Sequence, residues 1–338
     1  MYEKIIENIK SNLSENNELN KQYLSSQIEV YKDHPQSTEI IKEISQLIWE
    51  CMSEDEKNEF IEISENETPI VDILNDIYYD IDEGNYETPL KKLDEFMATF
   101  NPMFEDDDLI EYHFFTNLLE ELVFRNYIGL KKELKYIPNS QPLLDLYYIY
   151  GFLLLETGQY PKAEKYLKKA VKINPVSSRI ILELAEIHKI HTNNFDEYFK
   201  LTCDALRYAY SPQDIARCYR NLGYYYIEKN QTKTAQALFQ YSMEYDLSPL
   251  AYREIKNIPS KNEAQDLTAS RCMELIESEK IQTEANPFIL SMLDELTNEY
   301  MENKLYRQTL YYLEIKYNLN PDEKTLLEIK SIRNKINY

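Results

Sequence analysis

The stretch GQYPKAEKYLKKAVKINP, residues 158–175, constrains the fold more than any other part of the chain. Ala163, Leu167 and Ala170 recur at helical spacing, so they share one face of a predicted helix. Pro175 ends this helix, because proline cannot continue the backbone hydrogen bonds of a helix interior. The stretch therefore predicts an amphipathic helix whose packing face alternates small and large residues.

A second predicted helix lies directly upstream. Tyr147 and Tyr150 fall on one face of it, and Gly151 lies on the same face. Gly158 begins the turn between the helices, since glycine readily takes the left-handed conformation that ends many helices. Gly151 and Ala163 are expected where the two helices touch, because a bulky side chain there would push them apart.

The same order of large and small residues recurs along the chain. Gly223 takes the place of Gly151 in residues 216–249, and Ala185 takes it in the segment between. Weaker matches lie at residues 72–102 and 290–321, and two degenerate segments that read as helix pairs without the small residues lie at roughly 106–141 and 250–285. A helix pair repeated in this way predicts a stacked array, in which each pair covers the apolar face of its neighbours.

This pattern closely resembles the tetratricopeptide repeat, which places two antiparallel helices in about 34 residues. The resemblance covers residues 70–323 and is clearest at 144–177 and 216–249. It implies an all-α array of about seven helix pairs, wound as a right-handed α-superhelix with a concave groove.

The two ends of the chain fit the repeat less well. Residues 1–66 read as three helices with a possible fourth, which Ser53 and Glu56 would start as a capping box. This helical N-terminal segment is either a separate domain or a set of degenerate repeats that cap the array, with Trp49 in its core and residues 64–69 as a linker. Residues 324–338 read as a C-terminal capping helix.

Composition narrows the function classes. The chain has 338 residues and only 5 Gly, too few for the turns of barrels and Rossmann units. No apolar run is long enough to predict a membrane span or a signal peptide. Four cysteines without metal-ligand spacing predict reduced thiols and a cytoplasmic location.

The net charge of −22 is unevenly distributed. Residues 1–142 carry 12 Lys and Arg against 32 Asp and Glu, a net charge of −20, whereas residues 143–338 carry 25 against 27, a net charge of −2. An acidic chain repels phosphate backbones, so neither nucleic acid nor an anionic membrane is an expected partner. The asymmetry indicates that the two halves present different surfaces.

Candidate catalytic and metal-binding groups are sparse. His188 and His191 have ligand-like spacing but no further ligand in the sequence, so we interpret them as structural. The acidic run Glu105–Asp108 lacks the glycine and the closing glutamate of a calcium loop, and we expect it to stabilise the start of a helix in the following LIEYHFF. No nucleophile–base or phosphate-binding motif is present. The chain is therefore predicted not to be an enzyme and to need no metal or cofactor.

The tetratricopeptide resemblance also implies a binding surface. Proteins of that family line their groove with residues of the first helix of each pair, at fixed offsets from the small residue. Those offsets select eight candidate residues: Tyr148, Phe152, Arg179, Glu186, Lys189, Arg217, Arg220 and Tyr224. Arg and Tyr often dominate interfaces, and Arg suits carboxylates, so the expected partner is a protein or peptide, with acidic groups as one option.

One family variant is excluded and two functions remain open. The Lys and Asn clamp of chaperone-binding members is not reproduced, because Tyr148, Phe152 and Leu182 occupy those positions. The favoured function is a non-catalytic scaffold that binds a protein segment in its groove. The alternative is a receptor similar to the bacterial regulators that respond to small peptides, acting through protein contacts. The sequence leaves the oligomeric state open.

Overall fold

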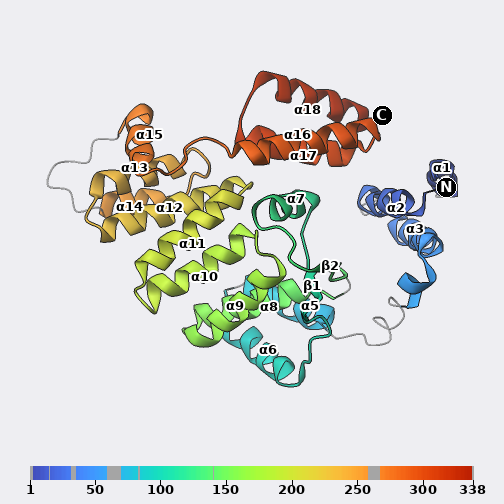
Figure 1. Cartoon of the computed structure of the whole chain (residues 1–338), viewed down its shortest axis with the longest axis horizontal. Helices are drawn as coiled ribbons and strands as arrows, with labels where there is room; N and C mark the ends of the chain where they lie inside the picture. The colour runs from blue at the N-terminus through green and yellow to red at the C-terminus, as the bar shows by residue number, and fades with distance from the viewer. Residues whose placement is uncertain are drawn as a thin grey trace. The chain divides into compact units, whose positions relative to one another are not determined.

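The computed structural model describes residues 3–14, 16–31, 36–58, 70–82, 84–139, 141–257 and 267–336 (Figure 1). The described chain is predominantly helical, which confirms the all-α prediction. It forms two compact units, one with residues from 1–68, 297–313 and 327–338, and the other with residues from 69–296 and 314–326. Among the described helices, none is long and apolar enough to cross a membrane.

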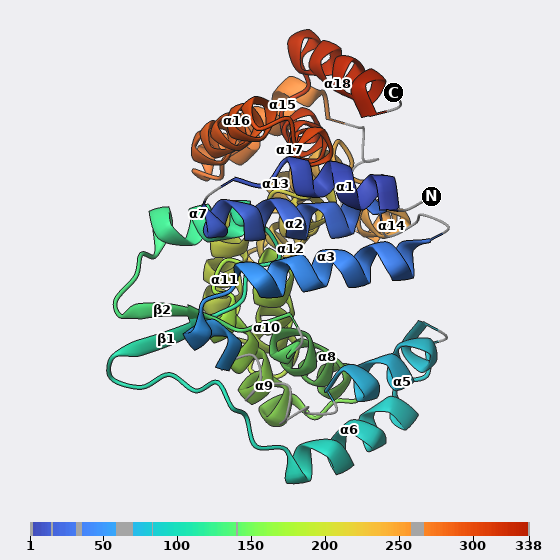
Figure 2. The same ribbon diagram turned by 90° about the vertical axis from the view of Figure 1, so that its right-hand side faces the viewer.

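Three helices form the N-terminal part of the chain and lie side by side (Figure 2). They are α1 (Glu3–Ser11), α2 (Asn17–Tyr31) and α3 (Ser37–Cys51). Ile9 and Ile44 are fully buried between them, whereas Trp49 is only partly buried. The predicted capping box is confirmed: Ser53 N donates to Glu56 Oε2 at 2.7 Å, and Glu56 N donates to Ser53 Oγ at 3.2 Å. The proposed linker at 64–69 lies outside the described residues.

The second unit contains the helix pairs that the sequence predicts. The first pair is α5 (Ile70–Asp82) with α6 (Glu87–Thr99), and three consecutive pairs are α8 (Leu143–Glu156) with α9 (Tyr160–Ile173), α10 (Ser178–Ile190) with α11 (Phe195–Tyr208), and α12 (Pro212–Glu228) with α13 (Thr232–Ser242). Each helix from α8 to α13 contacts the next, and α10 also contacts both α8 and α12 (Figure 1). The first helices of the three pairs therefore form one continuous layer, which we call the first-helix face.

The small residues lie where the helices of a pair touch, as predicted. A Cβ atom on Gly151 would lie 2.7 Å from Leu167 Cγ, and one on Gly223 would lie 2.8 Å from Phe239 Cζ. Real Cβ atoms do not approach other atoms so closely, so a larger residue would force the helices apart. These contacts fix how α8 packs on α9 and how α12 packs on α13.

The turns after α8 and after α12 have the same pair of hydrogen bonds. After α8, Gly158 has φ +78°, its N–H donates to Leu155 O at 3.0 Å, and the next N–H donates to Leu154 O at 2.8 Å. This is a Schellman motif, which satisfies the last carbonyl groups of a helix. Asn230 closes α12 with the same pair of bonds at φ +59°. The repeat is therefore visible in its turns as well as in its packing.

The prediction of a helix pair at 106–141 is wrong. This segment forms β1 (Ile110–His113), α7 (Leu118–Tyr127) and β2 (Glu133–Tyr136), and the two strands pair in parallel. Each strand interleaves aliphatic or aromatic residues with charged ones, which suits a short, half-exposed strand. Ile173 O, at the end of α9, accepts hydrogen bonds from Phe114 N at 3.3 Å and from His113 Nδ1 at 3.0 Å.

The acidic run before β1 stabilises a loop and a strand rather than a helix. Asp107 Oδ1 accepts hydrogen bonds from Leu109 N and Ile110 N, which lower the pKa of Asp107. Asp106 Oδ1 accepts from Tyr112 N at 2.9 Å. The expected helix start at LIEYHFF is therefore also wrong, because these carboxylates cap the backbone of β1.

The C-terminal third of the chain is helical. Its helices are α14 (Pro249–Asn257), α15 (Ala269–Ser278), α16 (Pro287–Glu302), α17 (Tyr306–Leu319) and α18 (Glu323–Ile336). Both α14 and α15 contact α13. Helices α16 and α17 pair through stacked rings of Tyr300 and Tyr312 and through an ion pair of 2.6 Å between Lys316 and Asp294. The predicted final helix is present as α18, and the ammonium of Lys335 in its last turn lies 5.1 Å from the centroid of the Tyr306 ring.

Candidate partner-binding surface

Tyr148 and Arg179 connect α8 to α10 on the first-helix face. Arg179 Nε donates to the Tyr148 hydroxyl at 2.7 Å, and the guanidinium carbon lies 4.5 Å from the Tyr148 ring centroid. Tyr148 is buried and Arg179 is exposed. Burial and the charge of Glu183 raise the pKa of Tyr148, against the opposing effect of Arg179, so its hydroxyl stays protonated at neutral pH.

Arg217 and Glu183 connect α12 to α10. Arg217 Nη1 donates to Glu183 Oε1 at 2.7 Å, and Nη2 donates to Oε2 at 3.0 Å. The Glu183 side chain is only 8% exposed. Burial opposes the charge of Arg217, but the hydrogen bonds and the charge of Glu183 outweigh it, so the pKa of Arg217 is raised. This two-point contact is the strongest form of an Arg–carboxylate pair.

Lys189 belongs to a third connection. It forms an ion pair with Glu186 on its own helix, and its ammonium lies 4.8 Å from the ring centroid of Tyr224 on α12. The Lys189 ammonium also lies 5.5 Å from the ring centroid of Tyr198 on α11. Cation–π contacts of this length are attractive and are stronger where water is excluded. Lys189 therefore holds α10, α11 and α12 together.

The last two candidates lie at the margins of this network. Phe152 stacks on Tyr148 with centroids 6.5 Å apart and meets Tyr86 edge to face at 5.8 Å. Arg220 Nη1 lies 3.4 Å from Asp246 Oδ2, and burial lowers the pKa of Arg220 despite that partner. The structure thus brings together seven of the eight candidates through contacts with one another or with Glu183, while Arg220 pairs separately.

Sequence reasoning did not include Glu183, the partner of Arg217, among the candidate residues. The signal that could have found it is its spacing: Glu183 and Arg217 are 34 residues apart, which is one repeat length. Opposite charges separated by one repeat on the first helix fall beside each other when the repeats stack. Two buried polar atoms without a hydrogen-bond partner among the described residues, Tyr198 Oη and Asn221 Nδ2, also belong to α11 and α12.

Three carboxylates on or beside this face form ion pairs with basic side chains of the same chain. The carboxylates of Glu183, Glu186 and Asp246 pair with Arg217, Lys189 and Arg220 respectively. Two further carboxylates, Glu156 and Asp214, are close enough to Arg217 and Glu183 to be affected by their charges. Burial is the largest cause of the raised pKa of each carboxyl. Neither has an ion-pair partner within the described chain. The face therefore carries more uncompensated negative than positive charge.

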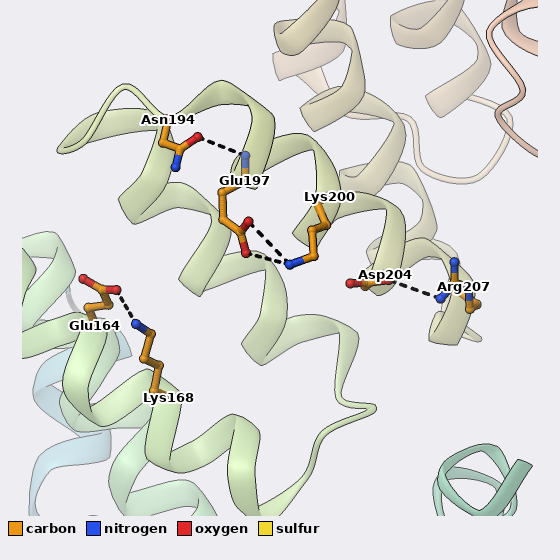
Figure 3. A network of polar contacts seen from close by, with 7 residues as sticks. All are labelled: Glu164, Lys168, Asn194, Glu197, Lys200, Asp204 and Arg207. Carbon is orange, nitrogen blue, oxygen red and sulfur yellow. Dashed lines mark hydrogen bonds and ion pairs between the residues drawn. The ribbon is translucent and has the colours of Figure 1, made fainter. Parts of the chain in front are cut away.

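On the second helices, several ion pairs join two side chains of the same helix (Figure 3). Three of their ion pairs lie within one helix: Lys168 with Glu164 on α9, and Lys200 with Glu197 and Arg207 with Asp204 on α11. Such exposed pairs at helical spacing contribute only a few tenths of a kcal/mol. The Arg217–Glu183 pair, which joins two successive helix pairs, thus differs from the local pairs shown in Figure 3.

Comparison with known proteins identifies one of the predicted repeats. Residues 144–175 match the family model of the tetratricopeptide repeat. The match spans α8, its Schellman turn and α9, and it confirms the resemblance on which the fold was predicted. A search of curated proteins finds no match for the chain. Tetratricopeptide repeats suggest a role in protein–protein interaction, and the matched repeat contributes Tyr148 and Phe152 to the network described above.

The groups considered for metal binding remain apart. His188 Nδ1 lies 3.5 Å from Thr192 Oγ1, whereas the His191 ring stacks on Tyr160 at 5.0 Å. In the part of the chain that the structure describes, no three His, Cys, Asp or Glu side chains are grouped closely enough to hold a metal. The four cysteines are free, and burial raises the pKa of Cys203 to about 11.

Proposed function

We propose that this chain is a non-catalytic scaffold whose first-helix face, over α8, α10 and α12, binds a segment of another protein. The observation that carries the proposal is the network of Tyr148, Arg179, Glu183, Arg217, Lys189 and Tyr224, which joins three successive repeats on one face. Ion pairs between repeats hold these side chains in fixed positions before a partner arrives, which reduces the entropy lost on binding.

The charge of this face favours a partner segment with basic side chains. Arg217 already directs both terminal nitrogens to Glu183, so an acidic partner would have to displace a buried carboxylate. Glu156 and Asp214 can receive a cation without breaking an ion pair of the chain. A lysine or arginine of the partner would supply a counter-charge to each of these carboxylates.

Affinity purification from the native cell extract, with quantitative mass spectrometry, tests the proposal. Glu156→Lys should lose the partner because it reverses the charge that attracts it. Glu164→Lys, on the second helix of the same repeat, is the matched control and should retain the partner. Equal retention by both variants would place the binding site on another surface.

A peptide-responsive receptor is the second candidate, and the same network favours it. Glu183 and Lys189 connect α10 to α12, so a ligand that displaces either contact would change how two repeats pack. A receptor should become measurably more compact, or less so, when its ligand binds. Small-angle X-ray scattering with and without the purified partner separates the two roles, because a scaffold should keep its radius of gyration.

A further inference from the structure

A cavity of about 240 Å³ lies beside the first matched repeat, away from the network on the first-helix face. It is bounded by the loop before β1, by β1 itself, and by side chains from α8 and the C-terminal end of α9. This volume is below the range of about 300–1,000 Å³ typical of drug-sized ligands, so the cavity suits a smaller molecule.

Aromatic rings form the apolar part of the cavity wall. Phe104 and Tyr112 meet edge to face with centroids 5.5 Å apart. Tyr147 closes the wall from α8 and is only 4% exposed. The wall is fixed in position, because Asp106 accepts a hydrogen bond from Tyr112 N at 2.9 Å and pairs with Lys172 of α9 at 3.0 Å.

Two opposite charges in the cavity have no ion-pair partner among the described residues. The Lys169 ammonium lies 5.0 Å from the Tyr147 ring centroid, and no carboxylate among the described residues lies within 4.0 Å of it. Glu105 lines the same cavity, and the described chain likewise offers it no cation at that distance. The cavity therefore presents one cation and one anion that do not neutralise each other.

The Tyr147 hydroxyl is the third polar group of the cavity. Among the described residues it has no hydrogen-bond partner, and the oxygen atom stays accessible to water from the cavity although most of the side chain is buried. Burial, and then the charges of Glu105 and Tyr166, raise the pKa of Tyr147 to about 12. The hydroxyl is therefore protonated at neutral pH and can donate a hydrogen bond. The oxygen of a bound ligand would accept this hydrogen bond in place of water.

We propose that this cavity binds a small zwitterion with an apolar side chain, such as a free aromatic amino acid. Its carboxylate would meet Lys169 and accept the hydrogen bond of Tyr147, and its ammonium would face Glu105. The side chain would lie against Phe104 and Tyr112. Neither a simple carboxylate nor a simple amine satisfies both unpaired charges.

Isothermal titration of the full chain with four probes tests this proposal. L-Phenylalanine carries all three features, 3-phenylpropionate lacks the ammonium, phenethylamine lacks the carboxylate, and glycine lacks the ring. L-Phenylalanine should bind, and each of the other three should bind at least about tenfold more weakly, which corresponds to about 1.4 kcal/mol. No heat from L-phenylalanine at millimolar concentration, or equal binding of all four probes, would overturn the proposal.

Variants place the binding in this cavity. Lys169→Met should weaken L-phenylalanine binding at least about tenfold, and Tyr147→Phe should weaken it about fivefold through the lost hydrogen bond. Lys168→Met is the matched control, because the neighbouring Lys168 pairs with Glu164 outside the cavity (Figure 3). Binding that survives Lys169→Met, or that is lost equally in Lys168→Met, would contradict the assigned site. Thermal melting of each variant distinguishes lost binding from lost folding.

Discussion

Arg217 of α12 and Glu183 of α10 lie one repeat apart in sequence and meet through two parallel hydrogen bonds of 2.7 and 3.0 Å. The contact ties α10 to α12, the first helices of two successive pairs, at a point where both side chains are mostly shielded from water. It also removes Arg217 from the set of groups that could receive an acidic partner. The same pair thus bears on both the stability and the specificity of the first-helix face.

Removing one member of this pair should be costly. Glu183→Gln leaves the Arg217 charge mostly buried without a counter-ion, and we expect it to lower the free energy of unfolding by about 3 kcal/mol. Urea denaturation followed by circular dichroism measures the loss. Glu164→Gln, which breaks an exposed pair on α9, should lower it by less than about 0.5 kcal/mol. Equal effects of the two variants would show that the Arg217–Glu183 pair is not a buried one.

A side chain in place of Gly223 should also destabilise the array. Gly223→Leu places carbon atoms in the space of the fully buried Phe239 ring, and we expect a loss of about 3 kcal/mol from overpacking. Gln213→Leu adds the same side chain at an exposed position of α12 and should change stability by less than about 0.5 kcal/mol. Unchanged melting of Gly223→Leu would refute the packing of α12 on α13.

Tyr147 and Tyr150 allow the effect of burial on stability to be measured separately from that of a hydrogen bond. The pKa values of Tyr147 and Tyr150 are both raised to about 12, chiefly by burial, whereas only Tyr150 donates to a carboxylate, that of Asp94 at 2.5 Å. At pH 7, Tyr147→Phe should leave the free energy of unfolding almost unchanged, and Tyr150→Phe should lower it by about 1 kcal/mol.

The same two residues predict how stability responds to alkaline pH. A folded-state pKa above the unfolded value of about 10 gives stability that is complete below pH 10 and is lost as pH rises towards 12. Stability of the native chain should therefore fall across this window, and Tyr147→Phe should reduce the fall. Unfolding curves at intervals from pH 8 to 12 check this, and an identical pH dependence in the variant would contradict the burial of Tyr147.

Replacing Lys304, in the turn after α16, should stabilise the folded protein. Lys304 ends α16 at φ +59°, in a Schellman motif where its N–H donates to Met301 O at 3.1 Å. A lysine is strained there and glycine is not, so Lys304→Gly should raise the free energy of unfolding by about 1 kcal/mol. Lys330→Gly, at an exposed interior position of α18, should lower it by about 1 kcal/mol. Destabilisation by both changes would refute the left-handed turn at Lys304.

The sequence alone predicted the repeat because its determinants are local. Gly151 and Gly223 sit at contacts that only a small residue permits, and Gly158 takes a backbone conformation that glycine favours. Residues 106–141 could not be assigned in this way. Their two strands are short and pair with each other across α7, so the stabilising contacts are non-local and leave no helical period to detect.

The sequence could predict on which helix face the candidate residues lie, but not which charged side chains pair with one another. Helical offsets place Tyr148, Arg179 and Arg217 on the first-helix face, where Arg179 contacts Tyr148 and Arg217 contacts Glu183. They do not reveal that Glu183 would occupy both terminal nitrogens of Arg217, because that depends on how far one repeat rotates against the next. This pairing is the reason why we propose a partner with basic side chains rather than acidic ones.

Site-directed photo-cross-linking tests most directly whether the first-helix face binds the partner. The photoreactive residue p-benzoylphenylalanine would replace Arg179, exposed on α10, and in a matched variant Arg207, exposed on α11. Irradiation in the native cell extract, followed by mass spectrometry, identifies what each position touches. We predict a protein cross-linked from position 179 and absent from position 207. The same protein captured from position 207 alone would contradict the assignment of the binding surface to the first-helix face.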